Sequence, residues 1–137
     1  MIQKQNDYQI EVTPVSRTRR VVLLLNVFFA LITVVFGILA VVDPLLVSGH
    51  GTVNATVELY VQAYMVRAVS IGVVVAVVAV MALRRDARGL LPVLLVAGLS
   101  QVGDVVIGVS QGIPGMAAGG LLCAVVHLGS AAWLRRS

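Results

Sequence analysis

Four long apolar stretches alternate with short polar or charged segments along the chain. They cover about residues 21–42, 56–83, 89–109 and 115–134. A helix needs about 20 apolar residues to cross roughly 30 Å of hydrocarbon, since it rises about 1.5 Å per residue. The first stretch also exceeds the apolar region of a secretory signal peptide, about 7–15 residues, so we expect it to remain as a span. The pattern predicts an all-α fold, an integral membrane four-helix antiparallel bundle.

The segments between these stretches carry residues that end helices. Asp43-Pro44 closes the first stretch and opens a loop over residues 43–55 that is rich in Gly, Pro and Ser. A charged turn at 84–88 follows the second stretch, and a short turn with Gly and Pro at 110–114 follows the third. Because these connections are short, we expect consecutive helices to be neighbours in the bundle.

The composition indicates a membrane protein. Of the 137 residues, 59% are hydrophobic and 12% are charged, and the mean hydropathy is +1.01. Soluble domains have about 25% charged residues, and a soluble fold of this size would leave much of this apolar surface in water. We therefore expect a multi-pass protein of the cell (inner or plasma) membrane, with membrane lipids as partners.

The net charge of +4 comes from basic residues whose positions indicate orientation. All the Lys and Arg residues except Arg67 lie in the N-terminal segment, in the 84–88 turn or at the C-terminal end. Basic residues mark the cytoplasmic side of membrane spans, so the sequence predicts an N-in/C-in topology. Residues 1–20 are then a cytoplasmic tail, 21–134 the bundle and 135–137 a cytoplasmic C-terminus. The same distribution argues against nucleic acid as a partner.

Small and polar residues recur on one face of each predicted helix. Such residues form helix contacts in membranes, because lipid is as apolar as leucine and gives large apolar side chains little reason to leave it. The residues expected to face inward are, in chain order, Asn26, Ala30, Thr33, Gly37; Tyr60, Tyr64, Arg67, Ser70; Ala97, Ser100, Gln101, Asp104, Gly108, Gln111; and Gly115, Gly119, Cys123, His127, Ala131. Their polar members predict a polar region inside the bundle.

Three ionisable side chains fall at membrane depth, namely Arg67, Asp104 and His127. A charge at the centre of a membrane helix costs roughly 2.5–3.5 kcal/mol on insertion scales, so such residues usually face the protein interior and pair. Counted from the outer ends of their helices, the three lie about 16, 9 and 18 Å deep. We therefore expect an ion pair between Arg67 and Asp104, with His127 just below Arg67.

These residues form a candidate site that has several interpretations. A ligand site would comprise Arg67, Asp104, His127, Tyr64 and Gln101 in a polar pocket that opens outward. In a catalytic site, His127 and Asp104 would act as acid and base, since imidazole titrates near neutrality. A structural clamp of Arg67 and Asp104 is a further interpretation, as is ion or proton passage. His127 would otherwise be a hydrogen-bonded packing residue.

We expect neither a metal nor a cofactor. His50, Asp43 and Glu58 near the outer loop match no metal-ligand spacing. Cys123 is the only cysteine, so an intrachain disulfide and a paired-cysteine metal motif are both excluded. The sequence also has no Gly-rich phosphate loop and no nucleophile elbow, which argues against a nucleotide-driven pump or hydrolase.

Three segments of the later spans are centred on these polar residues. They are Tyr64-Met-Val-Arg67-Ala-Val-Ser-Ile-Gly72, Gln101-Val-Gly-Asp104 and His127-Leu-Gly129. In these segments the chain resembles the small four-span bacterial membrane proteins grouped as DoxX-like or as related uncharacterised families. The resemblance implies a four-helix bundle with a polar cluster of Arg67, Asp104 and His127, and it implies no particular activity.

Three classes of function fit these observations. The first is a binding or accessory module, whose intramembrane pocket accepts a small lipophilic ligand or which scaffolds a partner. The second is a small membrane enzyme, such as an isomerase or oxidoreductase accessory, that acts on a lipid-soluble substrate. The third is a transporter subunit, which would form a homo-oligomer because four helices enclose little volume.

Overall fold

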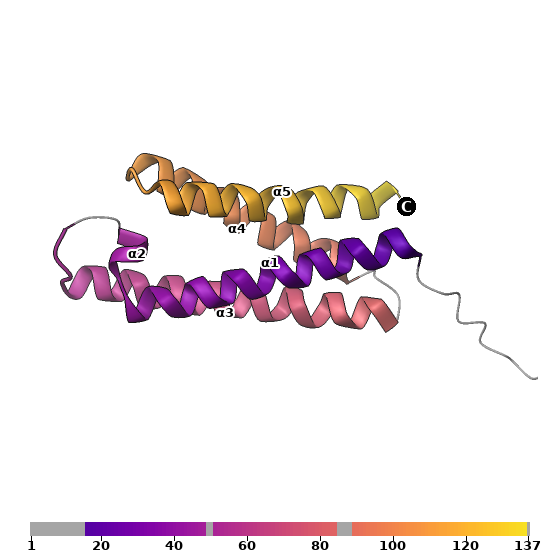
Figure 1. Ribbon diagram of the computed structural model, residues 1–137, viewed down its shortest axis with the longest axis horizontal. Coiled ribbons are helices and arrows are strands. Elements are labelled where there is room, and N and C mark those ends of the chain that lie inside the picture. Colours follow the sequence, from indigo (N-terminus) through magenta and orange to yellow (C-terminus); the bar gives the residue numbers. More distant parts are fainter. Residues whose placement is uncertain (1–15, 49–50, 85–88, 137) are drawn as a thin grey trace, which may run out of the picture.

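The computed structural model describes residues 16–48, 51–84 and 89–136, and helices are the only regular elements in these residues. The helices are α1 (Arg17–Val42), α2 (Leu45–Ser48), α3 (Ala55–Arg84), α4 (Leu90–Ser110) and α5 (Pro114–Arg136) (Figure 1). The four long helices, α1, α3, α4 and α5, are each long and apolar enough to cross a membrane. The predictions of an all-α chain and of four membrane-length helices are confirmed.

Some predicted features fall outside the described residues. They are residues 1–15 of the tail, His50, the charged turn at 85–88 and Ser137. The short helix α2 lies in the segment predicted as a loop, where the side chain of Asp43 accepts a hydrogen bond from the backbone N–H of Leu45 at 3.2 Å.

Side-chain caps fix where α1 and α3 begin. The Ser16 hydroxyl accepts a hydrogen bond from the backbone N–H of Arg19 at 3.3 Å. The side-chain oxygen of Asn54 accepts from the backbone N–H groups of Thr56 and Val57, both at 3.0 Å. These contacts satisfy N–H groups that the first turn of a helix leaves without a partner.

The turn between α4 and α5 is tightly specified by its sequence. Gly112 has a φ of 66°, a conformation that favours glycine. The N–H of Ile113 donates to the carbonyl of Gly108 at 2.7 Å, and that of Gly112 donates to Val109 at 3.3 Å. This pair of bonds is the Schellman arrangement that ends a helix. Pro114 then starts α5, at a position where its missing N–H removes no helical bond.

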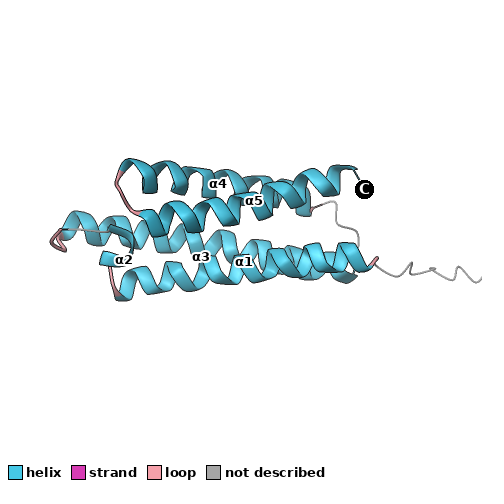
Figure 2. Cartoon of the chain, turned by 45° about the horizontal axis from the view of Figure 1, so that its top comes forward, coloured by secondary structure: helices cyan, strands magenta, loops and turns pink. Residues whose placement is uncertain are grey.

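The long helices form two hairpins, since α1 packs most extensively against α3 and α4 against α5 (Figure 2). We call α1 and α3 the first hairpin and α4 and α5 the second hairpin. In the first hairpin, a Cβ added at Gly37 would lie 2.8 Å from the Cβ of Ala68, and one at Gly72 would lie 2.8 Å from the carbonyl oxygen of Ala30. Glycine therefore lets these two backbones approach closely.

The second hairpin is held in the same way. A Cβ added at Gly108 would lie only 2.5 Å from the backbone nitrogen of Ala117, and one at Gly120 would lie 3.0 Å from the carbonyl oxygen of Gln101. The residues in contact run in opposite order along the two helices, as they do in the first hairpin. Close backbone contact, rather than large apolar side chains, thus holds each hairpin together.

The expectation that Gly115 and Gly119 face inward is wrong. Both are exposed, and a Cβ added at either would meet nothing within 4 Å. The buried face of α5 instead includes Met116, Gly120, Cys123 and His127. A strict spacing of four drifts about 40° around a helix at each step, so the series from Gly115 to Ala131 leaves the interior toward its start. Gln111 is exposed as well, because it caps the end of α4.

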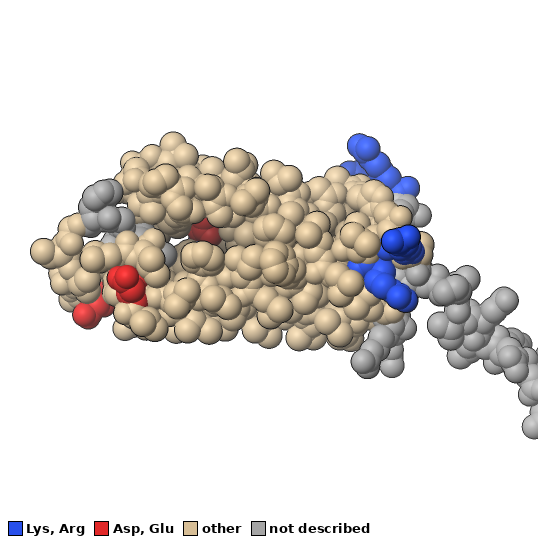
Figure 3. All heavy atoms as spheres, viewed as in Figure 1, with Lys and Arg blue, Asp and Glu red and all other residues tan. Residues whose placement is uncertain are grey.

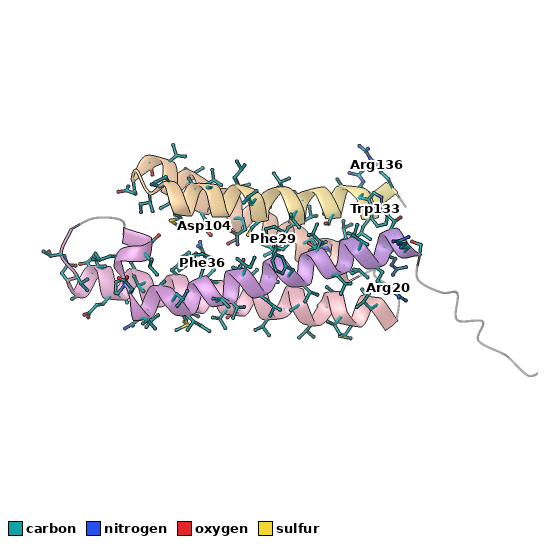
Figure 4. All side chains as sticks on the ribbon, viewed as in Figure 1. Arg20, Phe29, Phe36, Asp104, Trp133 and Arg136 are labelled. Atoms are coloured by element: carbon teal, nitrogen blue, oxygen red, sulfur yellow. The ribbon has the colours of Figure 1, made fainter. Side chains whose placement is uncertain are left out.

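The outer surface is what a bilayer requires. Phe28, Leu99 and Val125 are each more than half exposed, and large apolar side chains cover all four long helices in this way. Basic side chains gather at one end of the molecule (Figure 3), and Figure 4 places Arg20 of α1 and Arg136 of α5 there. An apolar belt with cations at one end matches a protein anchored in lipid.

The glycine contacts lead to a test of the hairpin packing. We expect Gly108→Ala to lower the free energy of unfolding by about 1–3 kcal/mol, because the added methyl group forces the backbones of α4 and α5 apart. Gly103→Ala on the same helix is the control, because a Cβ there meets nothing within 4 Å. Reversible unfolding in detergent micelles measures both. Equal effects of the two substitutions would contradict the packing role of Gly108.

Candidate functional site

Polar side chains of the two hairpins meet between them, beside a cluster of buried apolar side chains to which all four long helices contribute. Four such contacts cross between them: Asn26 with Ser130, Asn26 with His127, Thr33 with Cys123, and Arg67 with Asp104. The first three join α1 to α5, and the fourth joins α3 to α4. The backbone contact between hairpins is much less extensive than that within each hairpin. The polar contacts therefore add directional bonds to a seam that buried apolar side chains also pack.

Arg67 and Asp104 form an ion pair between α3 and α4. The two partners differ in exposure, since 38% of the Arg67 side chain is exposed but only 6% of the Asp104 side chain is. Figure 3 shows an acidic side chain at the bottom of a hollow between the hairpins, at the place where Figure 4 labels Asp104. The carboxylate is thus enclosed by protein, and more than a third of the Arg67 side chain stays accessible.

Tyr64 holds the other side of this arginine. Its ring lies 5.4 Å from the guanidinium carbon of Arg67, and both residues are on α3, three positions apart. Such a cation–π contact contributes about 0.5–2 kcal/mol, depending on how far it is desolvated. The Asp104 carboxylate also interacts electrostatically with Tyr60 and Cys123. Residues of α3, α4 and α5 therefore surround the ion pair.

Gln101, expected in the same site, is 7% exposed and lies three positions before Asp104 on α4. It belongs to the buried face of that helix. Its backbone carbonyl also meets α5 at Gly120, so this position connects the ion pair to a close backbone contact of the second hairpin.

His127 forms a second polar cluster with Asn26 and Ser130. The side-chain nitrogen of Asn26 donates to the carbonyl of Val22 at 2.8 Å and to the Ser130 hydroxyl at 2.7 Å. The carbonyl can only accept, which fixes the orientation of the amide. The amide oxygen of Asn26 then faces Nδ1 of His127 at 2.8 Å, so Nδ1 carries the proton and donates.

The structure does not bring His127 to Asp104. Both residues are described, and no hydrogen bond or ion pair joins them. The pairing of His127 and Asp104 as acid and base therefore has no direct contact to support it. Asn26 is fully buried and His127 is 2% exposed, which matches the interpretation of His127 as a hydrogen-bonded packing residue.

The partners that α1 supplies were not predicted from the sequence. Asn26 and Thr33 were expected on the inward face of the first span, but no contact was assigned to either. Thr33 donates its hydroxyl hydrogen to the carbonyl of Phe29 at 3.0 Å, so the thiol of Cys123 is the donor in their contact at 3.8 Å. A polar residue in the middle of an otherwise apolar span was the available signal.

An apolar groove runs between α3 and α4, with a volume of about 340 Å³. Its lining residues are Ser70, Ile71, Val74, Pro92, Val93 and Val96. The expectation that Ser70 faces the interior is wrong, since it is exposed at this groove. The face of α3 that packs inward against α1 carries Ala68 and Gly72 instead.

Comparisons with protein-family models, with curated proteins and with solved structures find no match for this chain. The function is therefore inferred from the chemistry of the site. In the described residues no group of three His, Cys, Asp or Glu side chains could hold a metal ion. What the site offers is a neutral pair of charges with guanidinium N–H groups left over, since one Arg67 nitrogen contacts one Asp104 oxygen.

The ion pair leads to a test that uses single and double substitutions. We expect Arg67→Leu to lower the free energy of unfolding by roughly 3–5 kcal/mol, because it leaves the Asp104 carboxylate buried without a counter-charge. Asp104→Leu should act in the same direction. Combining the two removes both charges and should restore most of the loss, as measured by unfolding in micelles. A double variant as unstable as the sum of the single variants would refute this account.

Proposed function

We propose that the four long helices form an antiparallel membrane bundle in the cell membrane, with both ends of the chain on the cytoplasmic side. The gathering of Arg20, Arg136 and the other described basic side chains at one end supports this topology, because cations flank spans on that side. Asp43 directly follows α1, and Glu58 lies in the first turn of α3. Both belong to the end of the bundle without basic residues.

We further propose that this protein is a binding module whose intramembrane pocket accepts a small lipophilic ligand with a polar group. One observation carries the proposal: Arg67 is paired with Asp104 at membrane depth and yet keeps 38% of its side chain exposed. If the guanidinium served only as a clamp, its remaining N–H groups would be expected to donate hydrogen bonds to acceptors inside the protein. Here more than a third of the arginine side chain stays accessible beside the buried carboxylate.

Within this pocket the residues have distinct roles. Arg67 donates hydrogen bonds to the ligand, and Asp104 fixes the guanidinium and neutralises its charge. Tyr64 packs against the guanidinium and limits its rotamers, and Gln101 supplies a neighbouring amide on α4. His127, which hydrogen-bonds Asn26, aligns the hairpins from the second cluster. This arrangement favours binding over acid–base catalysis.

The topology has a direct test. Cys123 is the only cysteine and is 5% exposed, so a cysteine introduced elsewhere can be labelled selectively. In sealed right-side-out vesicles, we expect a membrane-impermeant maleimide to label Val53→Cys readily and Arg136→Cys only after permeabilisation. The unsubstituted protein is the background control. Labelling of both positions from the same side would overturn the even number of crossings.

The binding proposal is tested on molecules that co-purify with the protein. Mass spectrometry of the protein in native lipid discs should find a compound enriched over bulk lipid. The Arg67→Leu/Asp104→Leu double variant is the matched control, because it removes the polar pair and should keep the fold. We expect the enriched compound to fall about tenfold in the double variant, which corresponds to a loss of about 1.4 kcal/mol. Bulk lipid alone in both samples would count against a ligand pocket.

A further inference from the structure

The apolar groove lies along α3 and α4, the same two helices that carry the ion pair. On α3, Val74 lies seven residues beyond Arg67, which is close to two full turns. On α4, Val93 lies eleven residues before Asp104, which is close to three full turns. Residues at these spacings share nearly the same face of a helix. The groove therefore begins about one turn from Arg67 on α3 and about two turns from Asp104 on α4, and it extends toward the basic end.

The chemistry changes sharply along this path. At one end lies a charged pair, with guanidinium donors left over. Over the next 10–16 Å, roughly, the exposed wall is apolar, formed by Ile71, Val74, Val93 and Val96 among others. A polar end joined to a long apolar trough is complementary to a molecule with one polar head and one apolar chain.

The depth and charge of the site limit which head groups it can bind. Arg67 lies twelve residues from the start of α3 and seventeen from its end, so it is about 18 and 25 Å from the two ends. A phospholipid head group at such depth would carry its charges into hydrocarbon at high cost. Asp104 already neutralises the guanidinium, so a second anion would compete with that carboxylate. A neutral hydrogen-bond acceptor meets neither obstacle.

We propose that the ligand is a neutral amphiphile with a single apolar chain, whose carbonyl-type head accepts hydrogen bonds from Arg67 while its chain lies in the groove between α3 and α4. This inference rests on the proposed binding function and adds the class of ligand and its path. Val74 and Val96 are about half or more exposed, so the groove opens to the surrounding lipid. The amphiphile enters sideways from the bilayer, which requires no opening of either helical hairpin.

The test uses a straight-chain methyl ketone that carries a diazirine near the end of its chain, added to the protein in lipid discs. Photolysis should label peptides of α3 and α4 at the groove. Val96→Phe fills the groove and should reduce labelling about tenfold, and the Arg67→Leu/Asp104→Leu double variant should reduce it similarly. Val106→Phe is the matched control on α4, since Val96 and Val106 are 61% and 62% exposed. It should leave labelling unchanged.

Each other outcome has a definite meaning. Equal labelling of the Val96→Phe and Val106→Phe variants would overturn the groove as the chain site, although a loss in the double variant would leave the binding function standing. Equal labelling of the double variant and the unsubstituted protein would show that the groove holds an ordinary acyl chain and that the head group is not recognised. A fatty acid of the same chain length that carries the same diazirine should label the protein less than the methyl ketone does. Equal labelling by the two probes would overturn the proposed preference for a neutral head group. Monodisperse elution of every variant confirms folding.

Discussion

Polar contacts in a medium without water hold the two halves of this protein together. Within each hairpin, glycines let backbones touch, as at Gly108 against Ala117. Between the hairpins, buried apolar side chains such as Leu23 and Leu94 pack together, but lipid solvates such side chains about as well as protein does. The hydrogen bonds of Asn26 and the ion pair of Arg67 therefore set the relative position of the hairpins. Every feature of the candidate site depends on that alignment.

The two clusters between the hairpins divide structure from function. The cluster of Asn26, His127 and Ser130 is buried and makes its hydrogen bonds within the protein, as an alignment device should. The cluster around Arg67 and Asp104 leaves 38% of the Arg67 side chain exposed. A polar group that is left incompletely paired in an apolar medium is costly. For this reason the cluster around Arg67 and Asp104 is the one that we propose as the site.

The sequence predicts the helices well because apolar length alone decides them, and the helices contain nearly all of the predicted spans. The pair of Arg67 and Asp104 is predictable too, since two isolated charges at similar depth have few other solutions. The contact of His127 with Asn26 is not predictable in this way, because it depends on the rotation of α5 about its axis. Counting by fours misplaced that rotation at Gly115 and Gly119.

The thiol of Cys123 lies on the seam between the hairpins, where it donates to Thr33 of α1. Cys123 is the only cysteine of the chain, so the reactivity of its thiol reports whether the two hairpins are in contact. Cys123 is 5% exposed, so an alkylating reagent reaches its thiol when α1 and α5 separate. Its rate of modification therefore reports how often the two hairpins separate. Oxidation at this one atom would wedge the halves apart from within.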